Sequence, residues 1–253
     1  MDDPTPPAID QRRALSFGAR AELYDRVRPS YPPQALSFLR ADLPIGQLPN
    51  RVVDVGAGTG KLTAVLAAAG FMVDAVEPDP DMRAVLAARV PAARVHAGRG
   101  EALPLSDGSV DAVVYGQAWH WVDGLAAARE AARVLRVGGT LAMLWNYEQD
   151  AAGWVGELAR LVGPSSADSP SPPVLPWFGA GQVSQLSWSR ELDVAVLPDY
   201  ALSHSAVAIL PERQRAEVLA AVAQLMAEHP DLHDRDRVAV PMQLTCWSYR
   251  LRP

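Results

Sequence analysis

The chain has 253 residues, of which 49% are hydrophobic and 21% charged, and its formal net charge is −6. These values are typical of a globular protein with a full core, and the acidic balance argues against a dedicated nucleic-acid surface. Cys246 is the only cysteine, which excludes an internal disulfide and a thiolate zinc cluster. No uninterrupted apolar run approaches the ~18 residues of a membrane span, and the N-terminus has no basic region followed by an apolar core. We therefore expect a cytoplasmic protein without a membrane partner.

The first residues of the chain differ in composition from the rest. Residues 1–15 are rich in proline and aspartate, which predicts a flexible tail ahead of a single domain over 16–253. A helical pattern follows and ends before Pro29. It places Tyr24 and Arg28, a hydroxyl and a cation, one turn apart, and a short helix over 33–39 is expected next.

The most informative stretch of the sequence runs from Val52 to Thr63. Apolar β-formers predict a short buried strand, and a helical pattern follows it. Between the two stand glycines, and a strand that ends in glycines and opens a helix lets a ligand approach the bare backbone. A dinucleotide fingerprint, G-x-G-x-x-G, would need a third glycine where Lys61 stands. The pattern present instead is Asp54-x-Gly56-x-Gly58-x-Gly60.

An acidic residue ends the next apolar run. Residues 71–76 predict the second strand, and Glu77 follows it directly. A carboxylate at the tip of the second strand is where a ribose hydroxyl pair is usually held. After it, Asp79 and Pro80 are typical of an N-cap and a first helical position, so we expect a helix there.

The Asp54-to-Gly60 pattern with Glu77 behind it resembles the first motif of class I S-adenosylmethionine-dependent methyltransferases. The Tyr24 to Pro29 segment resembles the entry segment of their type-11-like group, which includes trans-aconitate methyltransferase-like enzymes. This resemblance implies an α/β, Rossmann-like doubly wound sheet. The sheet would have seven mostly parallel strands, helices on both faces and an antiparallel last strand. It also implies S-adenosyl-L-methionine as the cofactor.

Two later stretches continue the resemblance. A strand over 93–97 leads into 98–104, which matches the family's second motif near the adenine, although Arg99 stands where the family usually has aspartate. A strand over 110–115 then delivers residues 116–121, with Gln117 and His120 close to where the sulfonium methyl should lie. Trp119 and Trp121 could wall an apolar pocket or belong to the core.

Taken together, the resemblance assigns a cofactor site and one catalytic candidate. His120 is the candidate general base because its unperturbed pKa suits proton transfer, and a structural histidine at a helix start is the alternative. Met82 could contact the adenine or belong to the core. The expected cofactor-binding residues are Tyr24, Arg28, Asp54, Gly56, Ala57, Gly58, Gly60, Glu77, Pro78, Met82, Gly100, Glu101, Gln117 and Ala118.

The rest of the chain is predicted from periodicity. The expected elements are a helix over 125–135 ended by Gly138 and Gly139, a strand over 140–145, a loop or lid over 147–182, a strand over 183–196, a helix over 211–229 and a strand over 238–251. The histidines His204, His229 and His233 are scattered, with no metal-ligand spacing, and are expected at the surface.

We therefore expect methyl transfer to a small-molecule acceptor, such as a carboxylate or a hydroxyl, by in-line displacement. The cofactor part would lie in residues 16–146 and the acceptor side in 147–253. Two alternatives stay open at this point: a protein that binds S-adenosylmethionine without catalysis, and a nicotinamide-dependent oxidoreductase. The sequence does not distinguish a monomer from a homodimer.

Overall fold

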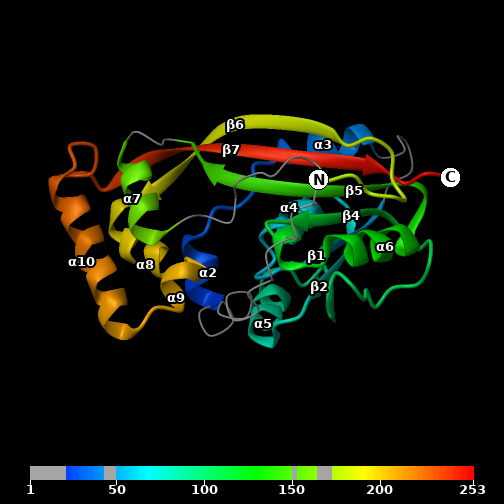
Figure 1. Ribbon diagram of the computed structural model, residues 1–253, viewed down its shortest axis with the longest axis horizontal. Coiled ribbons are helices and arrows are strands. Elements are labelled where there is room, and N and C mark those ends of the chain that lie inside the picture. The colour runs from blue at the N-terminus through cyan, green and yellow to red at the C-terminus, as the bar shows by residue number, and fades with distance from the viewer. Residues whose placement is uncertain (1–20, 43–49, 150–152, 164–172) are drawn as a thin grey trace, which may run out of the picture.

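Seven strands form one sheet that organises the whole molecule (Figure 1). The computed structural model describes residues 21–42, 50–149, 153–163 and 173–253, so the predicted tail lies outside the described residues. The strands are β1 (Arg51–Val55), β2 (Met72–Glu77), β3 (Arg94–Ala97), β4 (Val110–Gly116), β5 (Leu135–Glu148), β6 (Gln182–Asp193) and β7 (Arg237–Arg250).

The helices lie on both faces of the sheet and beyond one end of it. They are α2 (Ala21–Val27), α3 (Ala35–Asp42), α4 (Lys61–Ala68), α5 (Pro80–Arg89), α6 (Gly124–Val134), α7 (Trp154–Val162), α8 (Leu197–Leu202), α9 (Ser205–Ala208) and α10 (Glu212–Glu228), with short 3-10 turns at Trp119–Trp121 and Val194–Val196.

The strand order is β3-β2-β1-β4-β5-β7-β6, which confirms the predicted seven-stranded sheet. Strands β1 to β5 pair in parallel, whereas β7 pairs antiparallel with β5 and with β6. The order changes direction at β1, because β2 and β4 pair on either side of it. Such a switch point opens a crevice at the carboxyl ends of the strands.

The alternation of side chains along β1 separates the two cores of the sheet. Val52 packs in one cluster with Leu66 of α4, and Val53 packs in the other with Ala128 of α6. Neighbouring residues of a strand point to opposite faces, so both faces of this strand are covered by helices. The Asp79 carboxylate accepts from two amides in the first turn of α5, as predicted for an N-cap.

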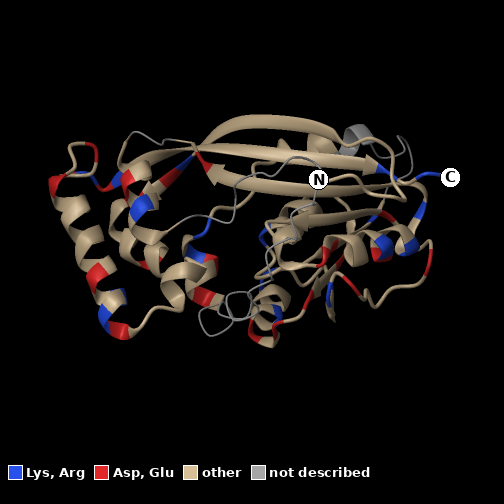
Figure 2. Cartoon of the chain, in the orientation of Figure 1, with Lys and Arg blue, Asp and Glu red and all other residues tan. Residues whose placement is uncertain are grey.

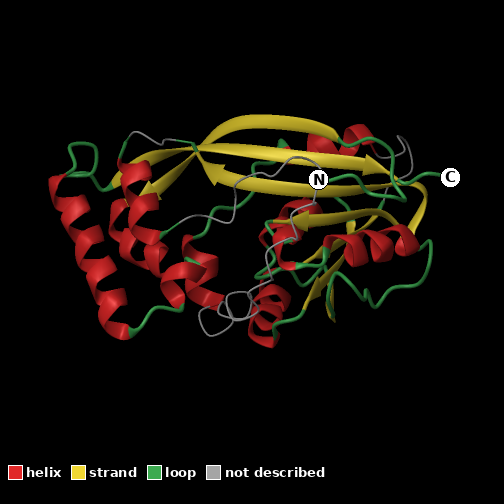
Figure 3. Ribbon diagram, viewed as in Figure 1, coloured by secondary structure: helices red, strands yellow, loops and turns green. Residues whose placement is uncertain are grey.

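A third hydrophobic cluster lies among helices at one end of the long C-terminal strands. We call α2 and α7 to α10 the helical lobe, since they gather at one end of the long strands β5, β6 and β7 (Figures 1 and 3). Its core combines Val27, Leu158, Leu197, Val222 and Met242, which come from α2, α7, α8, α10 and β7. The lobe therefore joins the early helix α2 to the C-terminal part of the chain.

Two expectations for the second half of the chain need correction. Gly138 and Gly139 do not end a helix: α6 ends at Val134, and the glycines lie inside β5, which begins at Leu135. Gly138 has φ +75°, and the pairing of β4 with β5 shifts register beside this stretch, so the glycines allow an irregular strand start. The strand predicted over 183–196 ends at Asp193 and passes into a 3-10 turn.

Basic and acidic residues are interspersed over both the sheet part and the helical lobe (Figure 2). In the part of the chain that the structure describes, no helix combines the length and the apolar character needed to cross a membrane.

The glycine turn after β1 yields a testable difference between two neighbouring positions. Gly56 and Gly58 both have positive φ, but a Cβ at Gly56 would lie 2.6 Å from the Ala118 Cβ, whereas a Cβ at Gly58 meets nothing within 4 Å. Gly58→Ala should lower the free energy of unfolding by about 1 kcal/mol through left-handed strain alone. Gly56→Ala should lower it by about 2 to 4 kcal/mol, because overpacking adds to the strain. Urea unfolding measures both, and equal losses would contradict this account of the turn.

Candidate active site

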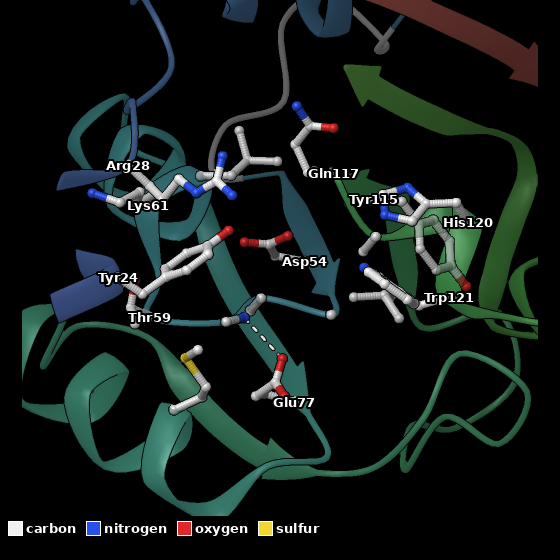
Figure 4. A pocket seen from close by; sticks show the side chains of 18 of the residues that line it. Tyr24, Arg28, Asp54, Thr59, Lys61, Glu77, Tyr115, Gln117, His120 and Trp121 are labelled. Atoms are coloured by element: carbon white, nitrogen blue, oxygen red, sulfur yellow. Dashed lines mark hydrogen bonds between the residues drawn. The ribbon is translucent and has the colours of Figure 1, made fainter. Parts of the chain in front are cut away.

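A cavity of about 290 Å³ opens at the carboxyl ends of β1, β2 and β4 and extends to the helical lobe. It lies at the switch point of the sheet, where open α/β folds bind their ligands. Figure 4 shows its two walls, with Tyr24 and Arg28 on one side and His120 and Trp121 on the other.

The floor of the cavity is the glycine turn, and Glu77 holds it in place. One carboxylate oxygen of Glu77 accepts from the Gly58 amide at 2.9 Å and the other accepts from the Asp79 amide at 2.9 Å. Burial raises the pKa of Glu77, while these two amides oppose the shift. Each carboxylate oxygen can accept a second hydrogen bond, so Glu77 can still receive hydroxyl groups from the cavity.

Beside the turn, Asp54 leaves a buried oxygen without a partner. Its Oδ2 accepts from the Thr63 hydroxyl at 2.6 Å, whereas its Oδ1 and the nearby Thr59 hydroxyl are buried with no hydrogen bond. Burial raises the pKa of Asp54 to about 7, against the effect of Thr63. Buried polar groups normally have a hydrogen-bond partner, so both oxygens are suited to accept a hydrogen bond from a ligand.

A second part of the wall comes from α5 and the segment after β3. Met82 is buried in the protein and also lines the cavity, so core packing and ligand contact coincide at this residue. Gly100 and Glu101 line the wall here, together with Arg99. A Cβ at Gly100 would lie 2.9 Å from the Tyr115 hydroxyl, which is buried without a hydrogen bond.

The segment after β4 forms the far wall. Gln117 has φ +55°, a strained conformation for this residue type, and its side chain donates to the Asn146 carbonyl. His120 and Trp121 line the cavity with their rings 4.7 Å apart. Trp119 is buried and packs edge-on against Tyr115, so the two tryptophans have different roles.

On the lobe side of the cavity, one histidine lies where the sequence analysis did not predict it. His204, expected at the surface, lines the cavity, and its Nε2 is buried without a hydrogen bond. Burial lowers the pKa of His204 well below its usual value, and the nearby Arg28 and Arg190 act in the same direction. His233, by contrast, is exposed as predicted.

The structure brings together almost every residue that the sequence nominated. His120 and all the expected cofactor-binding residues except Gly60 line the one cavity. Gly60 instead allows close packing, because a Cβ there would lie 2.9 Å from Leu86 Cγ. Sequence reasoning missed further polar residues of the wall: Tyr31, Thr59, Tyr115, Asn146, Glu148 and His204. Thr59 lies inside the glycine motif and could have been nominated from it, whereas His204 reaches the cavity only through the tertiary fold.

The cavity fits an S-adenosylmethionine-like ligand in its chemistry. Gly58 offers bare backbone facing open space, and the carboxylate of Glu77 lies beside it. The unsatisfied oxygens of Asp54 and Thr59 suit a hydrogen-bond donor such as an ammonium group.

Comparison with known proteins gives consistent family and fold matches. A family model described as a methyltransferase domain matches residues 53–143. An uncharacterized methyltransferase of Mycobacterium tuberculosis is 42% identical over 92% of this chain and 94% of its own length. A malonyl-[acyl-carrier protein] O-methyltransferase of Methylococcus capsulatus is 37% identical over 51% of this chain and 49% of its own length.

The fold is also found among solved structures. A protein of Anaeromyxobacter dehalogenans, provisionally described as a type II methyltransferase, superposes with a TM-score of 0.61 and 23% identity. The match covers 89% of this chain and 97% of that one.

The buried Asp54 carboxyl predicts a pH-dependent stability. Its pKa in the folded protein, about 7, exceeds the ordinary aspartate value of 3.8, so the stability that its proton confers is lost as the pH rises towards 7. Between about pH 5 and pH 8 the wild type should lose about 3 kcal/mol relative to Asp54→Asn, which has no proton to release at this position. Urea unfolding of both proteins across this range measures the difference. Parallel pH profiles would show that Asp54 titrates normally.

Proposed function

The chain belongs to the class I S-adenosylmethionine-dependent methyltransferases, and we propose that its cavity transfers a methyl group to a small-molecule acceptor. The observation that carries this proposal is Glu77 at the tip of β2, bound to the glycine turn at the switch point of the sheet. S-adenosylmethionine, when bound, supplies a methyl group on a positively charged sulfur, which is already activated for in-line displacement.

Different residues of the cavity would bind different parts of the cofactor. Glu77 would accept the ribose hydroxyls, and Asp54 with Thr59 would accept from the cationic end of the ligand. Met82, Gly100 and the rest of the α5 side would enclose the base. Because the methyl carbon is activated, the protein contributes alignment and the exclusion of water more than covalent chemistry.

Cofactor and acceptor would be bound by different parts of the chain. We assign cofactor binding mainly to residues 16–146 and the acceptor side to the C-terminal strands and helices. The range 147–182 was expected to be a loop or lid, but its described residues include the helix α7, whose Trp154 and Leu158 pack in the core of the lobe. The relative from Methylococcus capsulatus is named for O-methylation of a malonyl group, which supports including carboxylates among the acceptors to be tested.

His120 is the candidate general base, and its position supports this role. It lines the wall opposite Tyr24 and Arg28 (Figure 4), at the carboxyl end of β4. A neutral imidazole there could take a proton from a hydroxyl or amine acceptor. An acceptor carboxylate would need no base, so the dependence on His120 reports the class of the accepting group.

Cofactor binding tests the assignment of Glu77. Titration calorimetry with S-adenosylhomocysteine should show binding that Glu77→Ala weakens by about 30-fold, since hydrogen bonds to a charged acceptor contribute about 2 kcal/mol. Glu191→Gln, an exposed carboxylate on β6, is the matched control and should keep the wild-type affinity. Because Glu77 also holds the glycine turn, thermal melts must show that the variant is folded. Wild-type affinity in folded Glu77→Ala would contradict the ribose assignment, and binding of NADH instead would contradict the cofactor.

Turnover tests His120. With a hydroxyl acceptor found by screening radiolabelled S-adenosylmethionine against small molecules, His120→Ala should lower kcat by about 100-fold or more, as expected for loss of a general base. The affinity for S-adenosylhomocysteine should change little. Full turnover on such an acceptor would remove His120 from the mechanism.

A further inference from the structure

Two arginines converge on one tyrosine ring at the lobe end of the cavity. The guanidinium carbon of Arg28 lies 5.3 Å from the centre of the Tyr200 ring, and that of Arg190 lies 5.1 Å from it. Arg28 follows α2, Arg190 lies on β6 and Tyr200 on α8, so three distant segments of the chain meet here. Arg28 lines the cavity, whereas Arg190 does not line it and contacts the Tyr200 ring that Arg28 also contacts.

These guanidinium groups lack the partners that buried cations normally have. Arg28 donates to the Ser203 carbonyl at 3.2 Å and Arg190 donates to the Val27 carbonyl at 2.9 Å. The Nε of Arg28, and the Nε and one terminal nitrogen of Arg190, are buried without a hydrogen bond. Within the described ranges, neither guanidinium pairs with a carboxylate.

Other half-buried arginines of the chain show what is missing. Arg51 pairs with Asp74 at 2.6 Å, and Arg133 pairs with Glu130 at 2.8 Å. An unpaired buried charge is strongly destabilising, so a site that keeps two of them needs another source of negative charge.

The remaining side chains of this end of the cavity do not supply that charge. Glu148 lines the cavity, but its carboxylate accepts from the Tyr200 hydroxyl and, in the described part of the chain, forms no ion pair with either arginine. His204 stacks edge-on against Tyr200 at 5.0 Å, and its buried Nε2 has no hydrogen bond. The low pKa of His204, caused by burial and by both arginines, keeps its ring neutral near pH 7. A neutral imidazole can donate to an oxyanion or accept from a hydroxyl beside it.

We propose that Arg28 and His204 form a subsite for an oxyanion, a carboxylate or a phosphate, carried by the methyl acceptor, and that Arg190 adds positive charge to it from the same Tyr200 ring. Guanidinium groups recognise both anions through paired N–H donors, and the site retains several such donors. The subsite lies on the wall opposite His120, so the anion would orient the acceptor across the cavity. This inference rests on the proposed function, because it names the acceptor class of the same cavity.

One competing occupant has the same chemistry. The cofactor itself carries a carboxylate, and Arg28 stands among the expected cofactor-binding residues. The test therefore uses protein already saturated with S-adenosylhomocysteine, in which any cofactor carboxylate is in place.

Calorimetry on the saturated protein compares glutarate, inorganic phosphate and the uncharged diamide glutaramide at constant ionic strength. We expect glutarate or phosphate to bind about tenfold more tightly than glutaramide, and Arg190→Gln to reduce that difference by about threefold or more, because it removes one of the two positive charges. Preference for glutarate identifies a carboxylate acceptor, and preference for phosphate identifies a phosphorylated one. Arg190→Lys should restore part of the anion affinity, because it keeps the charge but not the paired donors.

Arg26→Gln is the matched control. Arg26 lies near Arg28 on α2 but is exposed and pairs with Asp199 on α8, so its loss should leave anion affinity unchanged. The affinity of Arg190→Gln for S-adenosylhomocysteine should stay within about twofold of the wild type.

Two results would overturn the proposal. In both, the affinity for S-adenosylhomocysteine is measured separately from the affinity for the anion. Equal affinity of the wild type for glutarate, phosphate and glutaramide would show that no anion subsite exists, whatever happens in the variants. A tenfold loss of S-adenosylhomocysteine affinity in Arg190→Gln, without anion binding to the saturated wild type, would assign both guanidiniums to the cofactor's own carboxylate. Failure of the wild type to bind S-adenosylhomocysteine would instead contradict the proposed function.

Discussion

A single carboxylate joins the two loops on which the cavity depends. Glu77 accepts from the Gly58 amide of the turn after β1 and from the Asp79 amide before α5. Because β1 and β2 are neighbours in the sheet, the tips of both strands are thereby fixed relative to each other. The same carboxylate keeps lone pairs for a ligand, so one residue both shapes the floor of the cavity and offers it an anionic acceptor.

The helical lobe completes what the sheet begins. Helix α2 and the helices after β6 share one hydrophobic cluster, and this packing carries Arg28 to the same ring as Arg190. The sheet end of the cavity is rich in carboxylates and bare backbone, whereas the lobe end is cationic. Such a gradient suits two ligands of different charge held side by side, a cationic cofactor and an anionic acceptor.

The sequence predicted the sheet part well because its signals are local. The Asp54-to-Gly60 spacing, the Glu77 position and the Asp79 cap each depend on a few neighbouring residues, and all except Gly60, which packs against Leu86, appear where expected. The lobe was harder, because His204 and Arg190 acquire their surroundings only through contacts between segments that lie far apart in the chain. The prediction that Gly138 and Gly139 end a helix was wrong for a related reason. Glycines are typical of a helix end, but here they allow the irregular start of β5, and that irregularity depends on the pairing of β5 with β4.

The central claim is that the cavity at the carboxyl ends of β1, β2 and β4 is the S-adenosylmethionine site. A crystal structure of the complex with S-adenosylhomocysteine tests it most directly. We expect both ribose hydroxyls within hydrogen-bond distance of the Glu77 carboxylate, and the ligand lying against the backbone of Gly58. A ligand bound elsewhere on the chain, or in this cavity with its ribose away from Glu77, would contradict it.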